Sequence, residues 1–320
     1  VYLQWYFAGM IPSMIYNMGA GILRAVGDSR RPLYFLIVCA AANTVLDLLF
    51  VAVFGMGTAG AAIATSLSQL ICAVLVLYTL ARASGACRLH LSKLCMDRTL
   101  LARMVAIGLP AGLASVMYCA ANVIIQRAIN LLGTNAAAAW SIYWKLDGIY
   151  WPISSAIGIT VMTFVGQNYG AQQHARITSC IRTGLWMDAG FSILFSVLLF
   201  FSRSFVVRFF TDDPAVMQEG GQIIAMLAFF YPTFVFVEIL SSAMRGTGNS
   251  VIPTVLTLFG VCVLRLVLLF TVTFPHLSDW TVALCYPATW ATTSVLFLIY
   301  YKCFRWMPAC REKAQEPDKR

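Results

Sequence analysis

One acidic residue, Asp47, lies deep inside a long apolar stretch of the sequence. On a helix it would lie about 22 Å from Pro32, within the hydrocarbon depth of a membrane. An ionised carboxylate is costly there, so Asp47 is a candidate carrier of a proton or another cation. Asn43 precedes it by one helical turn on the same face and can donate a hydrogen bond to the charged form. The alternative is that both residues only join neighbouring helices by hydrogen bonds.

A second set of candidate side chains lies between residues 135 and 165. Their spacing places them on one face of a helix: Tyr143, Asp147, Tyr150 and Ser154. A carboxylate among phenol rings can hold a lipophilic cation by charge and by cation–π attraction. The alternative for such aromatic residues is a belt at the membrane interface, which we expect for Trp140, whereas Asp147 is too deep for it.

Amide side chains mark one face of the preceding stretch, from 100 to 131. Asn122 and Gln126 lie one turn apart, and a polar face is costly against lipid, so this face should line a cavity or another helix. A packing role and a binding role both remain open. Among the other polar residues of the apolar stretches, we expect Glu238 and Arg265 to pair between helices and Asp188 to reach water.

The sequence lacks the patterns of enzymes and of metal or nucleotide sites. It contains no H-E-x-x-H, no C-x-x-C and no G-K-[ST], and its three histidines lie in connections between apolar stretches. We therefore expect a protein that is not an enzyme and has no metal or cofactor. Its energy source should be an ion gradient, with H⁺ or Na⁺ as the coupling ion.

Long apolar segments must position these residues. Hydrophobic residues make up 60% of the sequence, charged residues 11%, and the mean hydropathy is +0.79, whereas about a quarter of the residues in a soluble domain are charged. The segments lack the alternation of membrane strands, so we expect an all-α polytopic membrane protein. We predict nine spans, at residues 3–24, 32–54, 60–82, 100–131, 135–165, 178–202, 217–244, 252–274 and 280–302.

The net charge of +9 follows from membrane topology. Nearly all Lys and Arg outside the spans fall in loops on one side, and only Arg203 and Arg208 fall on the other. Positive loops stay in the cytoplasm, so we place the C-terminus inside a bacterial-type inner membrane and Val1 outside. The charge therefore gives no reason to expect a nucleic acid, and the expected partners are a small-molecule substrate and the bilayer, with a monomeric protein.

A motif of ten residues occurs twice, as Leu23–Pro32 (LRAVGDSRRP) and Met244–Pro253 (MRGTGNSVIP). The coinciding positions should terminate and cap helices at the cytoplasmic ends: Arg24, Gly27 and Pro32, and Arg245, Gly248 and Pro253. Both copies face the same side, which indicates two parallel repeats. When the two repeats are aligned, Leu268 occupies the position of Asp47 and Leu264 the position of Asn43. The architecture by itself therefore does not require an acid there.

The repeat also predicts the organisation of the chain. The second copy follows the fourth helix of its half, whereas the first copy follows the first helix. We therefore expect three further helices upstream of Val1 and twelve helices in two lobes of six. The parts of this chain would be a partial N-terminal lobe (1–82), a basic cytoplasmic linker (83–99), a C-terminal lobe (100–302) and a cytoplasmic tail (303–320).

With these motifs, the chain resembles the multidrug and toxic compound extrusion (MATE) family. The resemblance rests on the paired loops, on Asn43-Thr-Val-Leu-Asp47, on Gly60-Ala-Ala-Ile-Ala-Thr65 and on Gly166-Gln-Asn-Tyr-Gly-Ala171. It implies two six-helix lobes, of which 1–82 supplies helices 4–6 and 100–302 helices 7–12, around a central cavity. It also implies export of amphipathic, often cationic compounds, driven by inward flow of protons or sodium ions.

The pattern around Asp47 is similar to the DinF-like branch of that family. In that branch the Asn-x-x-x-Asp pair forms a polar site with a threonine on the next helix, which matches Thr65; Asn17 is a looser match. The rival interpretations are a lipid-linked oligosaccharide flippase of similar architecture and a membrane scaffold without transport. A flippase cavity should be rich in arginine, whereas only Arg127, Lys145 and Arg265 lie within spans.

Overall fold

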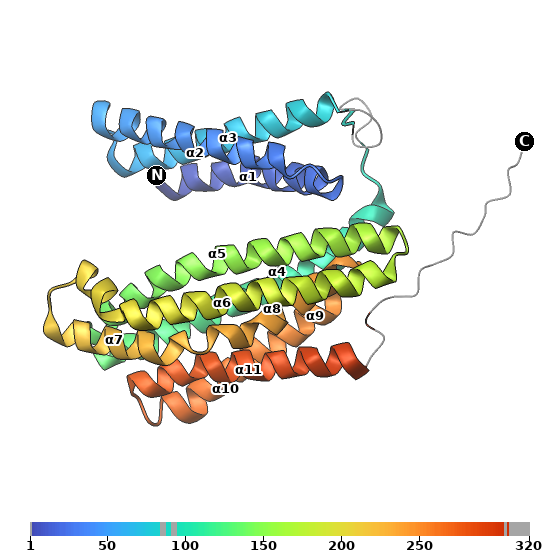
Figure 1. The fold of residues 1–320 in the computed structure, drawn as a ribbon. Helices are drawn as coiled ribbons and strands as arrows, with labels where there is room; N and C mark the ends of the chain where they lie inside the picture. Colours follow the sequence, from blue (N-terminus) through green and yellow to red (C-terminus); the bar gives the residue numbers. More distant parts are fainter. Residues whose placement is uncertain (1, 84–87, 91–94, 304–305, 307–320) are drawn as a thin grey trace, which may run out of the picture. The chain divides into compact units, whose positions relative to one another are not determined.

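The computed structural model describes residues 2–83, 88–90, 95–303 and 306, and the described residues form helices without any strand (Figure 1). The chain divides into two compact units, residues 1–97 and 98–320. The expected all-α architecture is confirmed. Much of the predicted linker (84–87 and 91–94) and most of the predicted tail (304–305 and 307–320) lie outside the described residues.

The smaller unit consists of three helical rods. They are α1 (Tyr2–Ala25), α2 (Arg30–Asp47) continued by the π-helix η1 (Leu48–Val53), and α3 (Gly57–Ala81). Helix α1 packs along α3, where Gly19 has no Cβ and so allows the side chain of Val76 to approach its backbone. Tyr16 ties α1 to the start of α2 by donating a hydrogen bond to the carbonyl of Pro32 at 3.0 Å.

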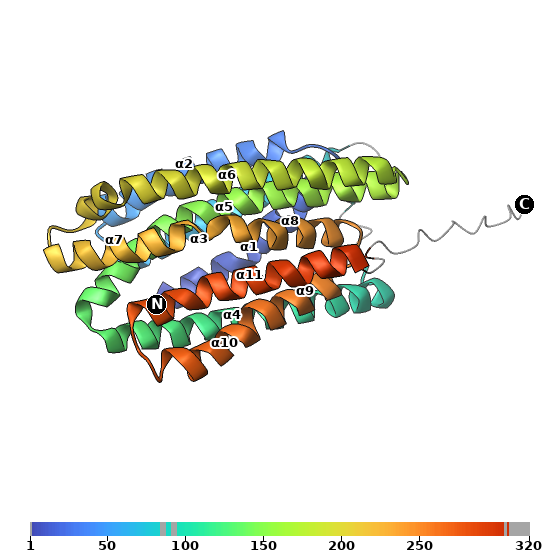
Figure 2. The ribbon, with the colours of Figure 1, turned by 60° about the horizontal axis from the view of Figure 1, so that its bottom comes forward.

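The larger unit begins with three long helices, α4 (Arg98–Leu132), α5 (Thr134–Gly170) and α6 (His174–Phe210). The next rod is broken into α7 (Pro214–Ala228) and α8 (Tyr231–Gly246), which meet at 49°. The following rod is made of four consecutive segments: α9 (Val251–Thr257), η4 (Leu258–Val263), α10 (Leu264–Leu268) and η5 (Leu269–Thr273). The last rod is α11 (Asp279–Cys303). Helices α5, α6 and α8 pack against one another, and α11 packs against α8 (Figure 1, Figure 2).

A helical rod lies at each of the nine predicted spans within the described residues. Seven rods are long and apolar enough to cross a membrane, and the bent pair of α7 and α8 makes an eighth. Helix α1 is not among them. The stretch carries Gln4, Ser13 and Asn17 among its apolar residues, and these polar side chains reduce its hydropathy.

The two copies of the motif have the same backbone geometry. Gly27 (φ +91°) and Gly248 (φ +87°) both adopt the left-handed conformation that ends a helix. In each copy the next residue donates its backbone N–H to the carbonyl five positions back: Asp28 to Leu23 at 2.9 Å and Asn249 to Met244 at 3.1 Å. The paired prolines are buried in the first turn of the following helices. The motif is therefore a helix stop followed by a helix start.

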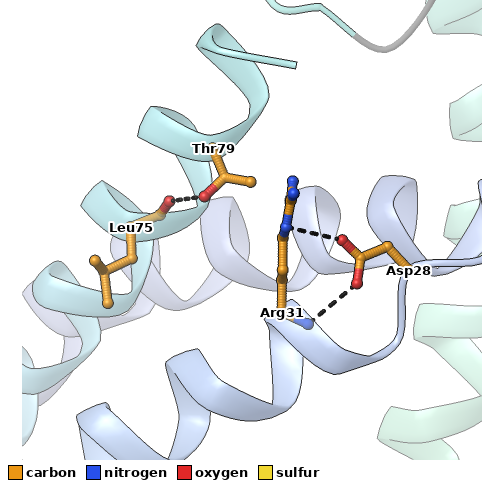
Figure 3. Close-up of polar contacts among 4 residues, drawn as sticks. All are labelled: Asp28, Arg31, Leu75 and Thr79. Atoms are coloured by element: carbon orange, nitrogen blue, oxygen red, sulfur yellow. Dashed lines mark hydrogen bonds and ion pairs between the residues drawn. The ribbon is translucent and has the colours of Figure 1, made fainter. Parts of the chain in front are cut away.

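The first copy carries an additional ion pair. Asp28 accepts a hydrogen bond from the backbone N–H of Arg31 at 3.1 Å and pairs with its guanidinium at 3.2 Å (Figure 3). The same view shows Thr79 on α3 donating its hydroxyl to the carbonyl of Leu75 at 2.9 Å. Such a bond satisfies a hydroxyl within its own helix, which is the usual solution in an apolar surrounding.

Candidate functional site

Asp47 ends α2 directly before the π-helix η1, and its side chain is half-buried. Its Oδ1 is buried and has no hydrogen-bond partner, and the same is true of Nδ2 of Asn43, one turn earlier. A buried acceptor and a buried donor are thus both unsatisfied on neighbouring turns. Such groups are costly unless a ligand, a proton or a rearrangement satisfies them, and π-helices are frequent at functional sites.

The other two residues predicted for this site are engaged elsewhere. Thr65 donates its hydroxyl to the carbonyl of Ala61 on its own helix at 2.9 Å. Asn17 is exposed and donates to the carbonyl of Ser13 at 2.9 Å. Within the described residues, no hydrogen bond joins either residue to Asp47. Asn43 Nδ2 has no partner either, so the four residues predicted for this site are not joined by hydrogen bonds in this structure.

Asp147 lies in a complete hydrogen-bond cage. Its Oδ1 accepts from the hydroxyl of Tyr231 at 2.8 Å and from that of Tyr143 at 3.3 Å, and its Oδ2 accepts from the indole N–H of Trp151 at 2.7 Å. The two tyrosine oxygens lie 3.2 Å apart, so either hydroxyl could donate to the other only by giving up its own bond to the carboxylate. Three donors directed at one carboxylate satisfy its charged form, and charge-assisted hydrogen bonds of this kind are strong.

A cavity of about 470 Å³ opens beside this cage. It is lined by side chains of α4, α5 and α11, among them the predicted residues Asn122, Gln126 and Asp147, together with Tyr118, Val123, Trp144, Gly148 and Tyr286. The amide of Gln126 also donates to Asn130 at 2.7 Å. The cavity offers a carboxylate, two amides and aromatic rings, which can hold an amphipathic ligand by polar and stacking contacts.

Two residues predicted for the cavity do not line it. Tyr143 is fully buried and acts through Asp147. Tyr150 is also fully buried, bonds to the hydroxyl of Ser192 at 2.8 Å and packs on Tyr231 with ring centroids 4.3 Å apart. The spacing of these two residues places them on the same face of α5 as Asp147. Beyond the cavity, that face packs inside the helix bundle.

Arg265 is the basic group of this region, and it does not pair with Glu238 as expected. It is 1% exposed, and its Nη atoms donate to Asn122 Oδ1 at 3.5 Å and to Thr289 Oγ1 at 3.4 Å. Its guanidinium also lies over the ring of Tyr286, 4.7 Å from the centroid. The arginine therefore stands behind the cavity wall, held by groups of α4 and α11.

Two further side chains refine the picture of this site. Trp140 is fully buried and donates its indole N–H to Asp279 Oδ1 at 3.0 Å, so the expected place in an interfacial aromatic belt is wrong.

Tyr231 provides the shortest tyrosine contact to Asp147, and the sequence did not lead us to predict it as a site residue. Its neighbour Pro232 was the available sign, because proline marks a helix start and so the break that directs Tyr231 inward.

Comparisons with known proteins agree with this architecture. A family model described as MatE matches residues 110–271, and one described as Lipid II flippase MurJ matches residues 1–130. The chain is 29% identical over 307 residues to the Probable multidrug resistance protein YpnP of Bacillus subtilis (strain 168), which covers 95% of this chain and 68% of that protein. It is 25% identical over 313 residues to the Probable multidrug resistance protein YoeA of the same strain, with 95% and 67% covered.

Solved structures share the fold. The crystal structure of MATE in the bent conformation superposes with a TM-score of 0.84 at 20% identity, over 93% of this chain and 67% of that chain. At this identity the likeness shows the fold alone. The chain spans about two thirds of the length of these relatives.

Proposed function

The chain belongs to the MatE family of membrane transporters, and we propose that it exports amphipathic cations across the cytoplasmic membrane in exchange for H⁺ or Na⁺. The observation that carries this proposal is Asp147, a carboxylate caged by three donors at the wall of an aromatic cavity. Fixed donors stabilise the charged form of this acid, and a bound cation would stabilise it further. The two Bacillus relatives are named probable multidrug resistance proteins, which agrees with the export of drug-like compounds.

Asp47 is proposed as the coupling residue. Its unpartnered Oδ1 and the unpartnered amide of Asn43 leave the site unsatisfied in this state. Binding of a proton or Na⁺ neutralises the acid and changes the packing of α2 against α3, and the substrate is released outside. Discharge of the ion to the cytoplasm restores the acid for the next cycle.

The proposal is tested by export of tetraphenylphosphonium from cells that express the protein from its complete coding sequence. Asp47→Asn should reduce ion-driven export about tenfold or more, since the amide cannot bind or release a proton. Asp212→Asn is the matched control, because it makes the same change at an exposed position between α6 and α7. Undiminished export by Asp47→Asn would remove Asp47 from the coupling scheme.

A flippase of lipid-linked oligosaccharides is the second candidate, and the MurJ match over residues 1–130 favours it. Its substrate is a polyprenyl diphosphate, which needs basic residues in the cavity. The cavity beside Asp147 is lined by no Lys or Arg among the described residues, which supports the efflux proposal. Proteoliposomes with a fluorescent lipid-linked saccharide distinguish the two functions: translocation of that lipid without export of the cation indicates a flippase, and neither activity indicates a scaffold.

A further inference from the structure

The interior of the larger unit contains a third acid, Asp188, which belongs neither to the Asn43–Asp47 pair nor to the Asp147 cage. Asp188 on α6 is 0% exposed, which overturns the expectation that it reaches water. Its Oδ2 accepts a hydrogen bond from the hydroxyl of Ser154 on α5 at 3.2 Å. Its Oδ1 is buried and has no hydrogen-bond partner. A fully buried carboxylate with one unsatisfied oxygen requires a ligand or a proton.

A second acid reaches the same place from another helix. Any side chain at Gly158 of α5 would collide with the carboxylate of Glu238, and its Cβ would lie 2.9 Å from the hydroxyl of Ser242. Gly158 follows Ser154 by one turn, so both positions share a face of α5. Asp188 from α6 and Glu238 from α8 therefore approach this face together.

No cation balances this pair from within the bundle. Asp188 forms no ion pair within the described residues, and Arg245, whose charge acts on Glu238, is exposed and lies two turns further along α8. The other titratable group facing the site is the phenol of Tyr150 on α5, which is neutral in its ordinary form. Two neighbouring anions in an apolar interior repel each other and lose their hydration, so one of them should take up a proton.

We propose that Asp188 and Glu238 form a proton-binding site in the core of the larger unit, with the proton on Oδ1 of Asp188. Oδ2 then remains the carbonyl oxygen that accepts the Ser154 hydroxyl, and Glu238 Oε1, which packs on Gly158, is the neighbouring acceptor. The assignment goes beyond the proposed function and does not depend on Asp47. It gives this unit its own exchangeable proton between α5, α6 and α8, whereas the cavity is lined by α4, α5 and α11.

Infrared difference spectroscopy of the purified protein at low and high pH tests the assignment. A protonated carboxyl group shows a carbonyl stretching band that ionisation removes and deuteration shifts. We expect one such band to vanish in Asp188→Asn and to persist in Asp47→Asn and Asp147→Asn, which separates this site from the proposed transport residues. Persistence of every carboxyl band in both Asp188→Asn and Glu238→Gln overturns the proposal.

Ser154→Ala supplies a test that keeps both acids in place. Without the serine hydroxyl, the carbonyl of protonated Asp188 accepts one hydrogen bond fewer, and its band should move to higher frequency. An unmoved band would show that the proton resides elsewhere. Addition of Na⁺ at constant low pH should leave the band unchanged; its loss would identify a sodium site and overturn the assignment to a proton.

Discussion

The rod after the paired motif is built alike in the two repeats but carries opposite polar groups. In both copies a left-handed glycine precedes a helix with a buried proline in its first turn. A π-helix begins at Leu48 in one copy and at the equivalent Leu269 in the other, where a further π-helix, η4, lies before it. Just before it, the first copy has the acid Asp47, whereas the second has Leu268, with the base Arg265 one turn earlier. The backbone pattern thus belongs to the architecture, and the charges are free to serve separate tasks.

The same contrast separates the two acids. Asp47 has a buried oxygen without a partner, whereas Asp147 has three donors and a nearby arginine. An unsatisfied acid is suited to gain and lose a cation, and a caged acid is suited to hold a bound cation in a fixed position. If this difference is functional, substitutions at the two positions should affect different steps of transport.

The largest expected effect is on binding of a cation. Asp147→Asn removes the carboxylate charge from the cavity, and affinity for tetraphenylphosphonium should fall by about tenfold to a hundredfold, since a cation close to a carboxylate in such a site gains up to about 4 kcal/mol. Asp47→Asn should change this affinity by less than about twofold. Fluorescence competition on the detergent-solubilised protein measures both.

Tetraphenylborate, which has nearly the same shape and the opposite charge, is the control for that measurement. Its affinity should not fall in Asp147→Asn. Equal losses for both ligands would mean that Asp147 shapes the cavity instead of attracting charge. Equal losses in Asp47→Asn and Asp147→Asn would remove the distinction between the two acids.

Substitution of the paired glycines should have an intermediate effect on the stability of the protein. Gly27→Ala and Gly248→Ala each force a side chain into the left-handed region, at a cost of about 1–2 kcal/mol. Both variants should therefore lower the unfolding temperature in detergent by a few degrees and by similar amounts. Gly21→Ala is the control, because Gly21 lies within α1 with open space around it, and alanine there should be neutral or stabilising. A marked difference between Gly27→Ala and Gly248→Ala would show that the two loops are not equivalent.

The sequence was sufficient for the helices and their repeat. Hydropathy locates the rods because the backbone must satisfy its own hydrogen bonds in lipid, and the paired Arg-x-x-Gly motif located both helix stops. The four-residue spacing of Asn43 and Asp47 and of Tyr143 and Asp147 correctly placed each pair on one face. What the sequence could not provide was the partner on another helix: Tyr231 for Asp147, Asn122 for Arg265, and Asp279 for Trp140.

These failures share one cause. Contacts within a helix follow from spacing, whereas contacts between helices depend on rotation and on breaks such as the one between α7 and α8. Asp188 is an example. Its position along the helix predicts access to water, but its side chain lies on a face that packs inside the bundle, and it is fully buried. A polar residue in a span can therefore be identified from sequence, but its role depends on the face it shares with its neighbours.

The smallest expected effect is a difference between two variants of the Asp147 cage. Tyr231→Phe removes the donor at 2.8 Å and Tyr143→Phe the donor at 3.3 Å. A hydrogen bond to a charged group contributes about 1.5–3 kcal/mol, and the longer bond should contribute less. The stability loss should therefore be larger for Tyr231→Phe, measured as the change in unfolding temperature. If Tyr143→Phe is as damaging as Tyr231→Phe, the two hydroxyls, whose oxygens lie 3.2 Å apart, act as one network, and the cage has to be treated as a unit. The double variant decides between these cases, because independent donors give additive losses and a coupled network does not.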